Sequence, residues 1–269
     1  MTGLFDLSGR VAVVTGASGT LGGTIARGLA AAGCSVGALA RRRDRLNTLV
    51  AELGPSAFAL EADVLDAGRL RAARDTVLER CGRLDVLVNC AGGNVPGAVT
   101  GERSFFELPS EALEEVVRLN LHGTLLPCQV LGETMATLDD PPPGGRSIVN
   151  ISSLAADRPL TRTVGYGAAK AAVENLTRWL AIELAPAGVR VNAIAPGFFA
   201  AEQNRTLIRN ADGTLTERGE RIVAATPAGR FGEPGELVGA AVYLAGAASS
   251  FVTGTVLTVD GGFSAYSGV

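Results

Sequence analysis

The sequence predicts a single doubly wound α/β domain with a mostly parallel sheet and helices on both faces. Short β-branched apolar runs alternate with amphipathic stretches long enough to form helices. Strands separated by helices of about ten or more residues need right-handed crossovers, which place neighbouring strands in parallel. Hydrophobic residues make up 47% of the 269 residues and charged residues 19%, so one large core is expected. No shift in composition marks a second domain.

The first half of the chain contains four expected strands. Residues 11–15 form a continuous β-branched run, typical of a strand that is buried on both faces. Gly33 and the Gly54-Pro55 pair end the first two helical stretches. The other strands of this half are expected at residues 35–40, 58–61 and 86–89, with helices up to residue 32, over 42–53 and over 70–80.

In the second half, the same alternation is interrupted by two long loops. We expect helices over 113–138, 167–184 and from about residue 236, with strands over 147–151 and 189–195. The loops are residues 92–109, which carry glycine and proline, and residues 198–226, which are polar and weakly periodic. Because ligands of a parallel sheet bind beyond the carboxyl ends of its strands, both loops should border the site. Residues 198–226 are a candidate lid.

Composition restricts the class of partner. The formal net charge is -3, and the only block of like charges is residues 41–43, which gives little support for a nucleic-acid or membrane partner. Four scattered cysteines and the single His122 predict neither a metal site nor a disulfide framework. We see no signal peptide and no apolar stretch that could span a bilayer. These features predict a cytoplasmic protein that binds a small molecule.

The turn after the first strand is rich in glycine. Residues 15–22 read Thr-Gly-Ala-Ser-Gly-Thr-Leu-Gly and lead directly into a helix. Glycine lets the backbone approach a pyrophosphate, and the helix N-terminus supplies amide donors and a positive dipole end. The pattern therefore predicts a dinucleotide site, with an ordinary tight turn as the alternative.

The end of the second strand indicates which dinucleotide is bound. Ala40 is followed by Arg41, Arg42 and Arg43, so the acidic residue that would bind the adenosine ribose hydroxyls is missing. Guanidinium groups match phosphate oxygens in bidentate fashion, which favours NADP over NAD. The alternative is that these arginines lie in solvent at the start of a helix.

Three polar side chains indicate the chemistry. Tyr166 and Lys170 stand at i and i+4 and share one helix face, where a nearby ammonium should lower the pKa of the phenol. Tyr166 could then act as a general acid or base. Ser153 follows an expected strand and could bind a substrate carbonyl oxygen. Together with the glycine turn, these residues predict hydride transfer between nicotinamide and a carbonyl or alcohol carbon.

Over its whole length the protein resembles the classical short-chain dehydrogenase/reductases. This resemblance implies a seven-stranded sheet, NADP or NAD as cofactor, and a homotetramer. Tyr166 would donate or accept the proton, Lys170 would bind the nicotinamide ribose, Ser153 would polarise the carbonyl, and Asn120 would hold a water in the proton relay. The matching motifs are residues 15–22, Asp63-Val64, residues 89–92, residues 120–123, Ser153, Tyr166-x-x-x-Lys170, Pro196-Gly197 and residues 260–262.

The resemblance also implies a set of cofactor contacts, in which Asp63 and Val64 would face the adenine. Three positions depart from the family pattern: Thr20 replaces a glycine of the turn, Cys90 replaces an asparagine, and Ala201 replaces a threonine. The expected cofactor contacts are Gly16, Ser18, Gly19, Thr20, Leu21, Gly22, Arg41, Arg42, Asp63, Val64, Asn89, Ala91, Gly92, Tyr166, Lys170, Pro196, Gly197 and Phe199.

Within the family, the protein is most similar to the subgroup of D-mannonate oxidoreductases, also called fructuronate reductases. The segments that carry this likeness are residues 89–94, 119–127, 192–199, 202–205 and 259–269. The likeness implies a sugar-acid substrate whose carboxylate needs a basic partner.

Asn94, Arg162 and Arg205 are the candidate substrate contacts, although both arginines could instead be solvated loop residues. Two other functions remain open: a reductase of uncharged ketones or 3-oxoacyl substrates, and an NAD(P)-sensing protein without turnover. We interpret His122 as a packed helix residue rather than a catalytic one.

Overall fold

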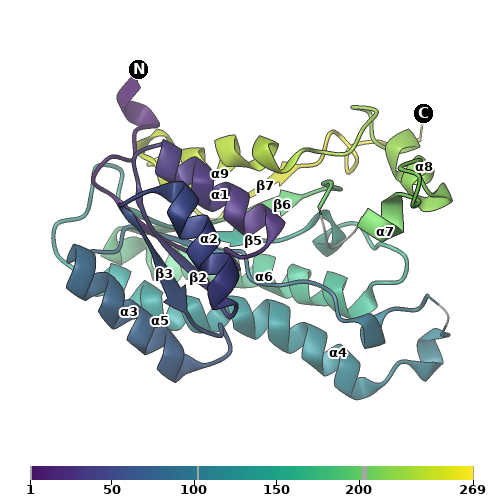
Figure 1. Cartoon of the computed structure of the whole chain (residues 1–269), viewed down its shortest axis with the longest axis horizontal. Coiled ribbons are helices and arrows are strands. Elements are labelled where there is room, and N and C mark those ends of the chain that lie inside the picture. The colour runs from purple at the N-terminus through teal and green to yellow at the C-terminus, as the bar shows by residue number, and fades with distance from the viewer. Residues whose placement is uncertain (1, 102, 202–204, 269) are drawn as a thin grey trace.

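The computed structural model describes residues 2–101, 103–201 and 205–268, and its centre is one seven-stranded parallel sheet (Figure 1). The strand order is β3-β2-β1-β4-β5-β6-β7, and each neighbouring pair is parallel. The predicted fold class is therefore confirmed. The strands are β1 (Val11–Thr15), β2 (Ser35–Ala40), β3 (Ala57–Glu61), β4 (Val86–Asn89), β5 (Arg146–Ile151), β6 (Val189–Pro196) and β7 (Val256–Val259).

Helices cover both faces of the sheet and enclose two apolar clusters. One cluster packs α1, α2 and α9 against the sheet, and the other packs α3, α5 and α6 against the opposite face. In Figure 1, α1 and α9 lie above the sheet, while α3 and α5 lie below it. The helices are α1 (Thr20–Ala31), α2 (Arg43–Leu53), α3 (Ala67–Cys81), α4 (Ser110–Val117), α5 (Gly123–Thr137), α6 (Val164–Glu183), α7 (Arg205–Ile208), α8 (Glu217–Ala224) and α9 (Val238–Ala245).

The register of the sheet brings the ends of the central strands together. In the register of the sheet, Thr15 pairs with Asn89, Asn89 pairs with Asn150, and Ile151 pairs with Ile194. The strand order reverses between β1 and β4, which is the switch point where ligands bind in doubly wound sheets. The glycine turn, residues 89–93 and Ser153 therefore leave the sheet at one edge.

The expected single helix over 113–138 is interrupted. A turn of π-helix, η4 (Arg118–His122), separates α4 from α5, and Asn120 lies within it. Such turns add one residue to a helix and are frequent at functional sites. Hydrophobic periodicity does not reveal this extra residue, because the residues on both sides of it still read as helix.

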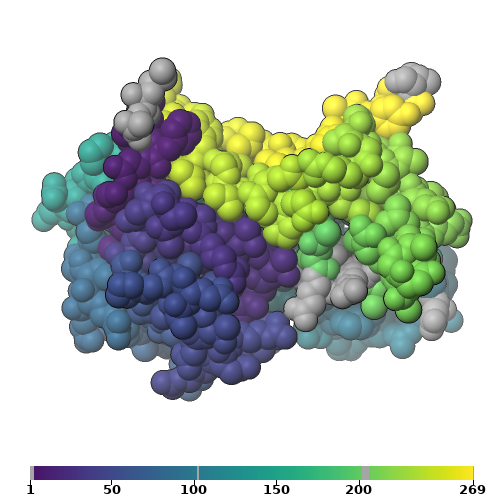
Figure 2. Space-filling view, turned by 45° about the horizontal axis from the view of Figure 1, so that its top comes forward, coloured from purple at the N-terminus to yellow at the C-terminus, as the bar shows by residue number. Residues whose placement is uncertain are grey.

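The described part of the candidate lid, residues 198–226, contains more helix than its polar sequence predicts. It contains α7 and α8, which pack Ile208 and Ile222 against Phe231 in an apolar cluster separate from the two main ones. A β-bridge between Phe199 and Gly232 closes its base. Figure 2 shows the green lid residues at one end of the molecule, apart from the purple amino-terminal half. In the described part of the chain, no helix is both long and apolar enough to cross a membrane.

Candidate active site

The glycine turn between β1 and α1 is packed so closely that larger residues would not fit. Gly16 has a φ of +66°, and a Cβ there would lie 2.8 Å from the backbone of Ala91. A Cβ on Gly22 would lie 2.5 Å from the carbonyl oxygen of Gly16. Both contacts are to backbone atoms, which cannot rotate away. These glycines therefore fix the turn against the segment that follows β4.

The N-terminus of α1 fits a phosphate group. Gly19 caps the helix without a side-chain hydrogen bond, and the first turn carries no acidic residue. The first amides of a helix lack internal partners, and they carry the positive end of the helix dipole. The predicted contacts Thr20, Leu21 and Gly22 supply these amides, so the turn can hold a pyrophosphate.

The predicted contacts for the adenosine end lie beside this turn. The Arg42 Nη2 atom is 3.4 Å from the Ser18 hydroxyl oxygen. The Arg41 Nη1 atom is 3.8 Å from an Asp63 carboxylate oxygen, with side chains 74% and 38% exposed. An ion pair this exposed contributes at most about 1 kcal/mol, so a phosphate could displace it. Val64 is buried against the Gly123 region and offers an apolar surface.

Ser153, Tyr166 and Lys170 come together at the end of β5. Ser153 precedes the short helix η5 (Leu154–Ala156), and its hydroxyl accepts a hydrogen bond from the Ala155 amide and is also hydrogen bonded to the Tyr166 phenol. Lys170 is buried, and its Nζ donates to the Ile151 carbonyl at 2.7 Å. The same Nζ lies 5.7 Å from the centre of the Tyr166 ring. The three predicted catalytic side chains therefore form one cluster.

The electrostatics of this cluster correct one prediction. The sequence predicts that Lys170 lowers the pKa of Tyr166, but burial raises the pKa of the phenol above its ordinary value, and the hydrogen bond with Ser153 only opposes this. Burial also lowers the pKa of Lys170 to about 8. The ammonium is directed at the Ile151 carbonyl rather than at the phenol oxygen. Desolvation therefore outweighs the hydrogen bond with Ser153, and it favours the neutral, protonated form of Tyr166.

Asn120 positions the turn beside Lys170. Its side-chain oxygen accepts from the Gly93 amide at 3.0 Å, and its amide nitrogen donates to the carbonyls of Gly93 and Val116. A Cβ on Gly92 would lie 2.7 Å from the Asn120 oxygen and 3.3 Å from Lys170 Nζ. The buried amide thus holds the Gly92–Gly93 turn beside Lys170.

His122, which shares the π turn with Asn120, is exposed, so its interpretation as a packed residue is wrong. The extra residue in the π turn changes which side chains face the core.

Asn89 faces the core with its side chain, so only its backbone is available to a cofactor. Its amide nitrogen donates to Asn150 at 2.9 Å and contacts the Cys128 sulfur, while Asn150 donates to Thr177 on α6. This buried network joins β4, β5 and α6. Thr15 has a related role, because its hydroxyl accepts from the amides of Cys90 and Ala91. The sequence signal for both missed residues, Thr15 and Asn150, is a polar side chain that directly follows an apolar run within its strand.

The predicted contacts after β6 are held by the C-terminal tail. A Cβ on Gly197 would lie 2.6 Å from Cβ of Asp260, and the Asp260 carboxylate accepts the amides of Gly262 and Ser264. Pro196 ends β6 directly before this contact. Phe199 is buried against Gly232, so its ring belongs to the base of the lid rather than to an open surface.

The structure places the three predicted substrate contacts differently. Asn94 is exposed on the loop after β4, where its side chain accepts from the Val95 amide. Arg162 is exposed on the loop before α6 and has a φ of +72°. Arg205 is the first residue of α7, but its side chain lies outside the described residues.

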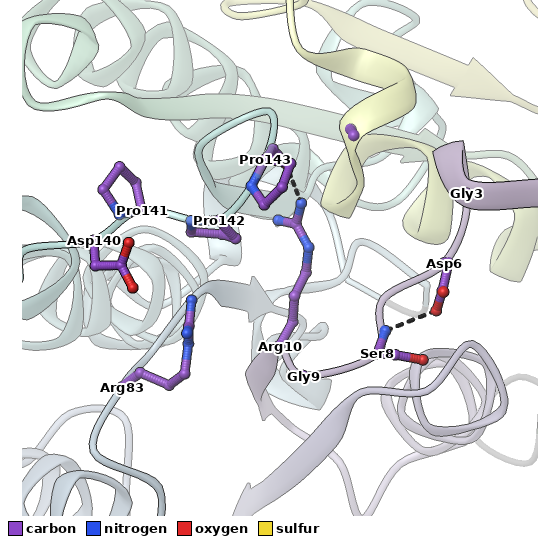
Figure 3. Close-up of a pocket in the computed structure, with 11 residues that line it drawn as sticks. Gly3, Asp6, Ser8, Gly9, Arg10, Arg83, Asp140, Pro141, Pro142 and Pro143 are labelled. Carbon is purple, nitrogen blue, oxygen red and sulfur yellow. Dashed lines mark hydrogen bonds between the residues drawn. The ribbon is translucent and has the colours of Figure 1, made fainter.

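A cavity of about 340 Å³ lies at the other edge of the sheet (Figure 3). Its lining includes Arg10 and Arg83, which precede β1 and β4 and therefore stand at the amino ends of the strands. Arg10 donates to the carbonyls of Pro143, Gly145 and Ala245, so it connects chain segments rather than facing a ligand. The predicted catalytic side chains are at the opposite edge.

Comparison with known proteins agrees with this geometry. The family model described as Enoyl-(Acyl carrier protein) reductase matches residues 16–264. The uncharacterized oxidoreductase UxuB of Bacillus subtilis (strain 168) is 43% identical over 277 residues, covering 98% of each chain.

Two crystal structures are also similar. A candidate D-mannonate oxidoreductase from Haemophilus influenza with bound NAD has a TM-score of 0.91 and 38% identity, covering 98% of both chains. A gluconate 5-dehydrogenase from Burkholderia cenocepacia J2315, in complex with NADP and tartrate, has a TM-score of 0.86 and 33% identity, again covering 98% of both. The protein therefore belongs to the classical short-chain dehydrogenase/reductases, a family of NAD(P)-dependent oxidoreductases that act on CH–OH groups.

Proposed function

We propose that the protein transfers a hydride between NADP(H) and the carbonyl or secondary alcohol of a sugar acid, such as fructuronate or mannonate. The observation that carries this proposal is the cluster of Ser153, Tyr166 and Lys170 at the same sheet edge as the glycine turn. The names of two similar structures support the substrate class, because mannonate and gluconate are both sugar acids.

The protein's own residues would supply proton transfer and positioning. The Ser153 hydroxyl would hold the substrate oxygen within reach of the Tyr166 phenol, to which it is already hydrogen bonded. In reduction, the neutral phenol would donate its proton to that oxygen, and in oxidation it would take the proton back. Lys170 would fix the nicotinamide ribose, and Asn120 would hold the Gly92–Gly93 turn against Lys170. The bound cofactor supplies the hydride.

The adenosine end supports NADP as the preferred cofactor. Arg41 and Arg42 follow β2, and Arg42 lies within 3.5 Å of Ser18. A 2′-phosphate would meet two guanidiniums and a hydroxyl here, whereas NAD would leave the arginines without that partner. The acidic group that pairs with Arg41 in the described structure is Asp63, and this pair is weak and exposed.

We also propose a cytoplasmic homotetramer. The outer face of α6 supports association, because Trp179 and Ile182 are 57% and 78% exposed on it. Large apolar side chains that gather on one face usually mark a contact surface. The scattered cysteines fit a reducing compartment.

The test is a substrate and cofactor screen followed at the absorbance of reduced nicotinamide. Fructuronate, tagaturonate, 5-ketogluconate and several neutral ketones are each offered with NADPH and with NADH. We expect turnover of the sugar acids, with NADPH preferred. Turnover of neutral ketones alone would replace the sugar-acid proposal with the alternative of an uncharged substrate. Tight cofactor binding without any turnover would instead favour a nucleotide sensor.

A further inference from the structure

Two arginines, one on a loop and one on a helix of the lid segment, lie near each other beside the catalytic helix. Arg162 lies on the loop that enters α6, four residues before Tyr166, and Arg218 lies on α8 in the lid segment. The Arg218 Nη1 atom is 3.4 Å from the hydroxyl of Thr161, the residue before Arg162. Burial lowers the pKa of Arg218, and the charges of Arg162 and Arg221 lower it further. The guanidiniums of Arg162 and Arg218 are therefore close enough to repel each other.

Neither guanidinium has an acidic partner among the described residues. Their neighbours do: Arg221, on the same helix as Arg218, lies 3.3 Å from Glu217, and Arg158 lies 3.7 Å from Asp157. No carboxylate within the described ranges comes within 4.0 Å of Arg162 or Arg218. Two like charges held together, one of them partly buried, favour the binding of an anion between them.

The backbone at Arg162 is also held in an unusual conformation. Its φ of +72° is rare for any residue other than glycine. Its carbonyl accepts a hydrogen bond from the Thr100 amide on the loop after β4. Both loops that border the carboxyl edge of the sheet therefore contact the segment that carries Arg162. Strained backbone of this kind persists where surrounding contacts enforce it, and it is concentrated at binding sites.

The helix that carries Arg218, α8, is held in place by packing within the lid. Thr216 caps α8 by accepting from the Gly219 amide at 3.1 Å, and Gly219 and Ile222 are buried against the rest of the lid. A Cβ on Gly219 would lie 2.4 Å from the Ile208 carbonyl oxygen, so α8 cannot shift freely along α7. The position of Arg218 is consequently fixed by packing rather than by its own charge interactions.

We propose that Arg162 and Arg218 together form the subsite for the substrate carboxylate. This inference rests on the proposed sugar-acid function, and it adds a lid residue that the sequence patterns did not single out. Each guanidinium can donate two parallel hydrogen bonds to a carboxylate. With one arginine before the catalytic helix and the other on the lid, a bound carboxylate would connect the lid to the catalytic residues.

The test compares three variants, Arg218→Gln, Arg162→Gln and the matched control Arg221→Gln. We expect the first two to raise KM for a hexuronate by about tenfold to a hundredfold, because each removes one partner of a charged contact. Their kcat/KM for an uncharged ketose should stay within about twofold of wild type, and Arg221→Gln should behave as wild type with both substrates. If the two arginines had a purely structural role, their replacement would reduce kcat/KM equally for both substrates, and that result would overturn the proposal.

A binding measurement separates this inference from the proposed function. Gluconate is titrated calorimetrically into each variant in complex with NADPH, which needs no turnover. Binding to wild type and Arg221→Gln, but not to the other two, supports the subsite even if no hexuronate is turned over. Equal binding by all variants, or none by wild type, refutes it. If wild type reduces hexuronates and Arg218→Gln keeps its KM, the subsite is wrong and the sugar-acid function stands.

Discussion

Replacing Lys170 with methionine tests the electrostatics of the site most directly. Methionine keeps an unbranched side chain, one atom shorter than that of lysine, and removes the amine. Lys170 is 4% exposed and is the only lysine in the sequence, so no other lysine titrates in the same pH range. We expect the variant to lose activity and also to change how stability depends on pH.

The magnitude follows from the burial of the amine. Burial lowers the pKa of Lys170 from 10.5 to about 8. Below about pH 8 the amine is charged in both the folded and the unfolded protein, and the folded state carries the whole cost of desolvating it. Between about pH 8 and 10.5 the unfolded protein binds more protons than the folded one, so wild-type stability rises with pH. At about 1.4 kcal/mol per pKa unit, the full rise is about 3 kcal/mol.

The assay is urea unfolding of wild type and Lys170→Met from pH 7 to 10 at constant protein concentration. Groups remote from Lys170 contribute equally to both proteins and cancel in the difference between the two free energies of unfolding. Cys90 is electrostatically coupled to Lys170, so its contribution remains part of the measured difference. Between pH 7 and 10, we expect the free energy of unfolding of wild type to rise, relative to that of the variant, by most of the roughly 3 kcal/mol. Parallel pH profiles, or a gain by the variant, would show that Lys170 does not carry a depressed pKa.

Three further predictions concern the proton donor and the cofactor site. Tyr166→Phe should reduce kcat by about 10²- to 10⁴-fold with an unchanged Kd for NADPH, measured by fluorescence; a loss smaller than tenfold would contradict its role as acid. Gly22→Ala should weaken NADPH binding at least about tenfold, because its Cβ would meet the Gly16 carbonyl at 2.5 Å, whereas Gly239→Ala, with open space around it, should bind normally. Arg41→Ala should raise KM for NADPH about tenfold and leave KM for NADH nearly unchanged; an equal change with both cofactors would argue against a 2′-phosphate contact.

The sequence alone predicts those parts of the fold and of the site that depend on a local pattern of residues. Six of the strands follow from buried β-branched or apolar runs, and the glycine turn stands where the predicted dinucleotide site requires it. The short β7 (Val256–Val259) was implied only by the family resemblance, and none of its residues is fully buried. Ser153, Tyr166 and Lys170 could be grouped because a strand end and one helix face bring them together.

What the sequence could not provide depends on distant contacts. The pKa of Tyr166 is raised because of burial, which is a property of the assembled site and not of the i, i+4 pair with Lys170. The π turn that contains Asn120 and exposes His122 leaves no trace in hydrophobic periodicity. Likewise, Arg218 acquires its neighbour Arg162 only when α8 packs near the loop before α6.

The separate apolar cluster of the lid has a consequence for how this protein could change over evolutionary time. Ile208, Ile222 and Phe231 pack among themselves and share no buried residue with the two clusters around the sheet. Substitutions on the part of α8 that carries Arg218 should therefore alter which substrates are accepted while leaving the folding of the sheet largely untouched. Substrate preference and cofactor chemistry can then vary independently, and exchanging residues 205–232 between relatives should transfer the first without disturbing the second.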